Sequence, residues 1–92
     1  MIVRIMEEGQ RRIADSAFPR LEELDEALLA AVEKGDEQAF RTTFGALLAA
    51  IRELGEPLPD DSLEPSDLIL PEEGASLEEV RGLLTENGLL PN

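Results

Sequence analysis

The sequence contains no cysteine, histidine, tryptophan or tyrosine, and its only lysine is Lys34. Without cysteine there is no disulfide framework, no thiolate nucleophile and no zinc site of the usual kind. Without histidine, the commonest general base and the commonest transition-metal ligand are both missing. The groups left for chemistry are carboxylates, arginines, a few hydroxyls and one amine. We therefore predict that the protein is not an enzyme and that it holds no metal ion or cofactor.

Basic charge is scarce as well. The 92 residues include 21 Asp and Glu but only 8 Lys and Arg, which gives a net charge of −13. The imbalance grows along the chain: residues 1–20 have a net charge of +1, whereas residues 56–92 hold ten acidic residues and one arginine. Such a chain repels nucleic acid and anionic membrane surfaces, so neither is expected as a direct partner. Its field favours a basic protein partner.

Long hydrophobic runs are also absent. The apolar run before Arg4 is too short for a signal peptide. The longest apolar stretch, residues 45–51, lies between Arg41 and Arg52 and is far shorter than the roughly 20 residues that span a bilayer. We therefore expect a cytoplasmic protein without direct membrane insertion. The length predicts a single domain, residues 1–92.

The first residues predict a β-hairpin. Ile2–Met6 is rich in β-branched residues, Glu8-Gly9 is typical of a tight turn, and Gln10–Ala14 would return as a second strand. A two-residue turn would place Arg4 opposite Ile13. A three-residue turn through Gln10 gives the better apolar match, with three side chains on one face: Val3, Ile5 and Ile13. The pattern leaves the register open.

Two helices are predicted next. Asp15-Ser16 is a suitable N-cap for a first helix that includes Pro19 in its first turn and runs to about Lys34. Gly35-Asp36 would end this helix and cap a second, and a turn so short forces the two helices to be antiparallel. The second helix runs from Glu37 to about Leu54. The two apolar stripes supply most of the expected core: Leu21, Leu24, Leu28, Ala31 and Val32, then Phe40, Phe44, Leu47, Leu48, Ile51 and Leu54.

An acidic, proline-rich segment follows, and then a third helix. Leu68–Leu70 lies between two prolines and is either a short third strand or an apolar plug over the helices. Ser76 and Glu79 form a capping box, from which a helix should run to about Glu86. The predicted fold class is α+β. Its parts are a β-hairpin at residues 1–14, an antiparallel helical hairpin at 16–55, the acidic proline-rich segment at 56–75, and a C-terminal helix and tail at 76–92.

Two features of the sequence are candidate protein-binding sites. On a strand, Leu68 and Leu70 share one face and Ile69 takes the other. Ile69 is covered either by the third helix or by a partner protein, in which case four acidic residues would surround it: Asp60, Asp61, Glu64 and Asp67. These acidic residues lack the spacing and glycine of a calcium loop. The second candidate is the patch of Gly45 and Ala49, where a side chain is missing or small and another surface can approach closely.

Several strings of residues resemble those of the PspAA family, the PspA-associated proteins found beside PspA in actinobacteria and other prokaryotes. The most specific strings are Gly-Glu-Pro-Leu-Pro-Asp-Asp at 55–61 and Pro-Ser-Asp-Leu-Ile-Leu-Pro at 65–71. Weaker similarity covers residues 1–5, 8–10, 21–28, 76–81 and 88–91. The resemblance spans nearly the whole chain. Arg11 and residues 17–19 depart from the family pattern.

The resemblance implies a small accessory protein of the phage-shock envelope stress response. PspA is a membrane-remodelling coiled-coil protein, and a PspAA protein is expected to act with it as an adaptor or modulator, without catalysis. Basic stretches on such a coiled coil would suit an acidic partner. Two alternatives remain open: a self-assembling structural module that uses the Gly45–Ala49 face or a strand edge, and an acidic mimic of nucleic acid.

Overall fold

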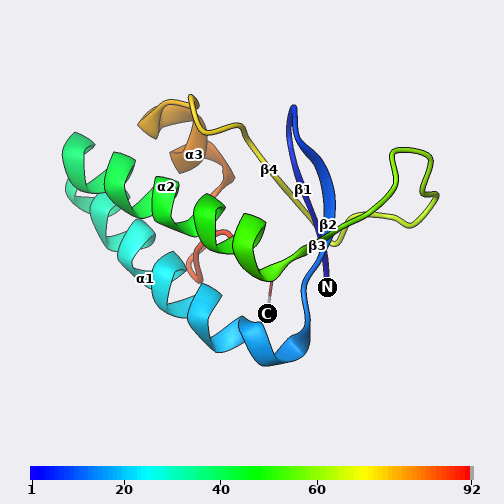
Figure 1. Ribbon diagram of the computed structural model, residues 1–92. Coiled ribbons are helices and arrows are strands. Elements are labelled where there is room, and N and C mark those ends of the chain that lie inside the picture. The colour runs from blue at the N-terminus through cyan, green and yellow to red at the C-terminus, as the bar shows by residue number, and fades with distance from the viewer. Residues whose placement is uncertain (92) are drawn as a thin grey trace.

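The computed structural model describes residues 1–91, in which a helical hairpin packs on one face of a four-stranded sheet (Figure 1). The α+β prediction is thus confirmed. In chain order the elements are β1 (Ile2–Ile5), β2 (Gly9–Arg12), the 3-10 turn η1 (Asp15–Ala17), α1 (Phe18–Lys34), α2 (Glu37–Leu54), β3 (Glu56–Pro57), β4 (Leu68–Leu70) and α3 (Leu77–Leu83).

The β-hairpin forms, but its turn lies earlier than predicted. Residues 6–8 make the turn, with Glu7 at a φ of 78°, and Gly9 already pairs with Ile5. Arg4 therefore lies opposite Gln10, not Ile13. The predicted apolar face is nevertheless correct, because Val3, Ile5 and Ile13 are all buried. Burial of this face sets the register, and the turn adapts to it.

The sheet has the order β3-β2-β1-β4, so β4 lies at one edge. Leu68–Leu70 is a strand and pairs in parallel with β1, while β1 and β2 pair antiparallel. The side chains alternate as predicted: Leu70 is fully buried, but Ile69 is 56% exposed. The prediction that the third helix covers Ile69 is therefore wrong. The helices all lie on the other face of the sheet, where Leu70 enters the core (Figure 1).

The helical hairpin follows the local signals of the sequence, with one exception at its start. Asp15-Ser16 does not cap α1: these residues form η1, and no side chain caps the helix at Ala17. Gly35 takes the left-handed conformation, with a φ of 68°, that ends α1. The Asp36 carboxylate accepts a hydrogen bond from the Ala39 N–H at 3.0 Å and so caps α2.

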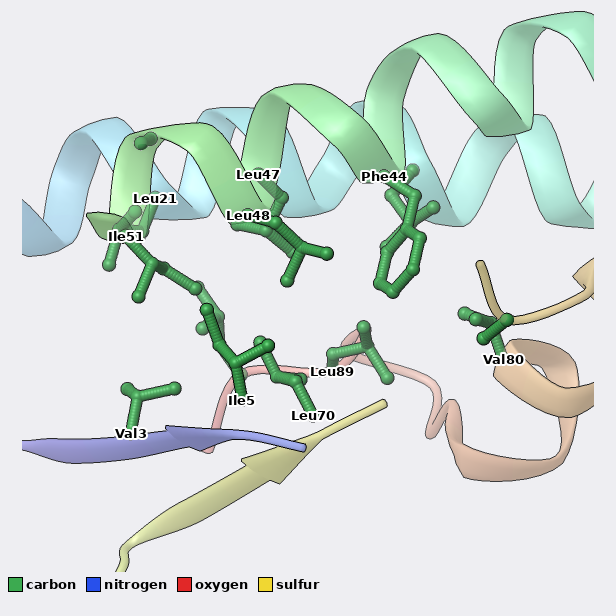
Figure 2. Close-up of a cluster of buried hydrophobic side chains, with 14 of the residues drawn as sticks. Val3, Ile5, Leu21, Phe44, Leu47, Leu48, Ile51, Leu70, Val80 and Leu89 are labelled. Atoms are coloured by element: carbon green, nitrogen blue, oxygen red, sulfur yellow. The ribbon is translucent and has the colours of Figure 1, made fainter. Parts of the chain in front are cut away.

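The core lies between α1, α2 and the inner face of the sheet (Figure 2). Of the predicted helical stripes, Leu24 is half-buried and Leu54 is 41% exposed, which corrects the expectation for Leu54. The rings of Phe40 and Phe44 stack with their centres 5.5 Å apart. The side chains labelled in Figure 2 come from every layer: Val3, Ile5, Leu21, Phe44, Leu47, Leu48, Ile51, Leu70, Val80 and Leu89.

The third helix is shorter than predicted. The capping box of Ser76 and Glu79 is present, but α3 ends at Leu83 and not near Glu86. Beyond it, the N–H of Gly88 donates to the carbonyl of Thr85 at 3.1 Å, which turns the chain back. The turn brings the following leucines, Leu89 and Leu90, into the core.

Candidate protein-binding surfaces

The outer face of the sheet exposes two apolar side chains near the hairpin turn. Ile69 lies on the edge strand β4, directly beside Arg4 of β1 in the parallel register. Met6, one residue beyond β1, donates its N–H to the carbonyl of Leu70 at 2.9 Å and is 49% exposed. We call Met6 and Ile69 the edge patch. It combines an open strand edge with apolar side chains, as surfaces that bind extended peptides do.

The four acidic residues predicted around Ile69 do not form one rim. Asp60 and Asp61 are exposed in a loop that projects away from the strands (Figure 1). Glu64 pairs with Arg12, with 2.6 Å between Oε2 and Nη2. The Asp67 carboxylate accepts the N–H of Ile2 at 2.8 Å. Two of the four are therefore available in the projecting loop, and two help to hold the proline-rich segment against β1 and β2.

Gln10 fixes the same segment to the sheet. Its side-chain amide donates to the Ser66 hydroxyl at 2.7 Å and to the carbonyl of Glu64 at 3.0 Å, and the residue is only 8% exposed. The proline-rich segment thus covers the outer face at β2, whereas Ile69 on β4 stays exposed although both Gln10 and Ile69 pair with Arg4 of β1.

The Gly45–Ala49 patch is divided between two environments. A side chain at Gly45 would contact the carboxylate of Glu73, whose Oε2 lies 3.8 Å from the position of a Cβ atom. Ala49 is exposed and instead lines a groove beside the start of α1. The two residues are neighbours on α2, but an acidic loop borders one and the groove borders the other.

The profile of one protein family, PspAA (PspA-Associated protein), matches residues 1–92. The chain belongs to the PspAA family. No curated protein and no solved structure matches it significantly. The match includes the hairpin, both long helices, the proline-rich segment and α3, so the edge patch and the groove both lie within PspAA sequence. The resemblance found in the residues is confirmed.

Within residues 1–91 of this PspAA chain, no helix is both long enough and apolar enough to cross a membrane. The two long helices are amphipathic, and their large apolar residues, apart from Leu29 and Leu54, lie in or against the core.

Sequence reasoning missed a charged junction at Arg52. Its guanidinium contacts both carboxylate oxygens of Glu8, at 2.8 and 2.6 Å, and a carboxylate oxygen of Glu73 at 3.1 Å. Its backbone carbonyl accepts a hydrogen bond from Arg11. The hydrogen bonds with Arg52 lower the pKa of Glu8. The hydrogen bonds with Glu8 and Glu73 raise the pKa of Arg52. This junction ties the hairpin turn and the loop before α3 to the end of α2.

A second missed feature is the buried carboxylate of Asp25, which is only 3% exposed. Its two oxygens accept the backbone N–H groups of Leu89 and Leu90, at 2.9 and 3.1 Å. Gly88 must lack a side chain, because a Cβ atom there would clash with the carboxylate of Asp25. The signal was available in the sequence: Asp25 lies on the apolar stripe of α1, between Leu21 and Leu28.

Proposed function

We propose that this chain is a non-enzymatic acidic adaptor or modulator that binds a PspA-like coiled-coil protein in an envelope stress response. The family match over residues 1–92 supports association with PspA. The net charge of −13 suits a basic partner, and the fold offers an open apolar strand edge. The protein then acts in the cytoplasm and reaches the inner face of the cell membrane through its partner, without inserting into the bilayer.

The edge patch is the contact surface in this proposal. The observation that carries it is the exposure of Ile69: an isoleucine on an edge strand is 56% exposed, while the next residue is fully buried. An apolar, β-branched side chain on an open strand edge is a liability unless another surface covers it. Asp60 and Asp61 lie in the projecting loop, away from the edge patch, and add long-range attraction for a basic partner as it approaches.

The test is a binding titration of purified PspA with wild-type protein and two variants. Ile69→Asp should abolish binding, because it places a charge in the apolar contact, and should leave the thermal melt nearly unchanged. Leu63→Asp is the matched control, since Leu63 is 97% exposed in the projecting loop. Normal binding by Ile69→Asp, or loss of binding by Leu63→Asp alone, would move the contact away from the edge patch.

The same titration repeated at several salt concentrations tests the role of charge. Exposed charges are screened over about 8 Å at physiological ionic strength. The affinity of the wild-type protein for PspA should therefore fall as salt rises, and neutral variants at Asp60 and Asp61 should show a shallower fall. An affinity that does not change with salt would remove electrostatics from the mechanism.

A further inference from the structure

A groove of about 550 Å³ lies where the start of α1 meets the end of α2. Its wall is built mainly of small side chains, and we call it the alanine groove. The residues that line it are Ser16, Ala17, Arg20, Ala46, Ala49, Ala50, Glu53 and Leu54. Because the alanine side chains on α2 are short, another surface can approach the helix backbone closely.

Leu54 forms a ridge at the end of this groove. It is 41% exposed although it belongs to the apolar stripe of α2. It also borders a second recess, of about 400 Å³, which reaches Met1 and Ile13. An apolar ridge with a hollow on each side is shaped to pack against a matching ridge and hollow.

The charges around the alanine groove select its occupant. Arg20 on α1 and Glu53 on α2 are the two charged residues that line the groove, and their charges balance in a chain whose net charge is −13. Arg20 also lies 3.9 Å from Glu23 on its own helix, where both side chains are largely exposed. A basic partner is drawn instead to residues 56–92, where acidic residues outnumber basic ones ten to one. Two copies of the chain repel each other least where their contact surfaces are neutral.

We infer that the alanine groove binds a second copy of this chain in a twofold symmetric dimer. In an isologous contact the same surface serves both copies, so Leu54 of each enters the alanine groove of the other. The same symmetry brings Arg20 of one copy toward Glu53 of the other. This contact uses a different face from the edge patch and does not depend on the proposed function.

Sedimentation of the wild-type protein over a range of concentrations and salt gives the first test. Because small and apolar side chains make up most of the contact and the two copies repel each other through their net charge, the dimer should strengthen as salt rises. The screening length falls from about 30 Å at 0.01 M to about 3 Å at 1 M salt. Binding to a basic partner should change in the opposite direction. A protein that stays monomeric at about 1 mM, the range of very weak complexes, in both salt conditions overturns the inference.

Ala49→Glu tests the groove itself. The variant places a charged side chain in the groove and should weaken the dimer by at least about tenfold, which corresponds to 1.4 kcal/mol. Ala30→Glu is the matched control on an exposed position of α1 outside the groove. Circular dichroism should show that both variants remain folded. An equal effect of the two substitutions, or no effect of Ala49→Glu, overturns the inference.

A charge exchange tests the symmetry. Arg20→Glu and Glu53→Arg should each weaken the dimer, because each puts like charges across the contact. The double variant restores opposite charges and should recover most of the affinity. Failure of the double variant to recover, while both single variants are weakened, overturns the twofold arrangement.

Discussion

The two faces of the sheet differ more than the sequence of its strands suggests. On the inner face Val3, Ile5 and Leu70 are fully buried under the helices, whereas on the outer face Ile69 and Met6 are about half exposed. Ile69 and Leu70 are adjacent and similar in size, and only the alternation of the strand separates them. The difference teaches that apolar character alone does not identify core residues in this chain. The position of the helical hairpin decides which apolar side chains stabilise the fold and which are free for contact.

The largest expected effect comes from truncating the two neighbours separately. Leu70→Ala should lower the free energy of unfolding by about 2–5 kcal/mol, because it opens a cavity in a close-packed core. Ile69→Ala should change it by no more than about 0.5 kcal/mol, as exposed substitutions usually do. Urea denaturation followed by circular dichroism measures both. A similar loss for the two variants would mean that the outer face is covered as well.

A smaller effect should come from Gln10, the polar residue buried on the outer face. Gln10→Ala removes two hydrogen bonds to the proline-rich segment and should cost about 1–2 kcal/mol, since each such bond contributes about 1 kcal/mol. Gln38→Ala, at an exposed position early in α2, is the control. If the two variants unfold at the same urea concentration, the segment is not held to the sheet through Gln10.

The smallest expected effect on stability comes from the ion pair between Glu8 and Arg52, which lies at the hairpin-turn end of the sheet. Both side chains are about 30% exposed, so the pair should contribute less than about 1 kcal/mol. Folding lowers the pKa of Glu8. Its stabilisation is therefore present above the ordinary glutamate pKa of about 4.3 and is lost as the pH falls through the lower folded value.

Unfolding of Glu8→Gln at neutral and strongly acid pH measures this contribution. The variant should be less stable than the wild type at neutral pH and equally stable in acid. Glu7→Gln, one residue earlier in the same turn, is the matched control for the effect of the substitution itself. If Glu8→Gln is also less stable than the wild type at acid pH, the loss of stability has a cause other than the charge on Glu8.

Local chemistry made much of the fold predictable from sequence. Gly35 supplies the left-handed residue that ends α1, and Asp36 caps the start of α2. Ser76 and Glu79 form the capping box of α3. Leu68–Leu70 could be proposed as a strand because prolines on both sides exclude a helix. These signals act over a few residues, so one sequence suffices to read them.

The errors concern contacts between residues far apart in the chain. The hairpin turn moved because the burial of Val3 and Ile5 sets the register, and α3 ended early because the tail turns back to Asp25. Arg52 meets Glu8 across 44 residues, which no local pattern indicates. For the candidate site, exposure of Ile69 followed from strand alternation only once the helices were known to lie on the other face. The separation of Asp60 and Asp61 from Ile69 depends on the path of a loop.

The parallel pairing of β1 with β4 also constrains the order in which the chain folds during synthesis. The helical hairpin is built from neighbouring residues, so it can form as soon as α2 has been made. Val3 cannot pair with Leu68, its partner in β4, until 65 further residues have been synthesised. At synthesis rates of about 5–20 residues per second, the interval between the end of α2 and the end of β4 lasts about 1–3 s. During that time β4 does not yet cover its part of the apolar face of the helical hairpin. A nascent chain is therefore most exposed to aggregation and to chaperones in this interval, before its edge strand has been made.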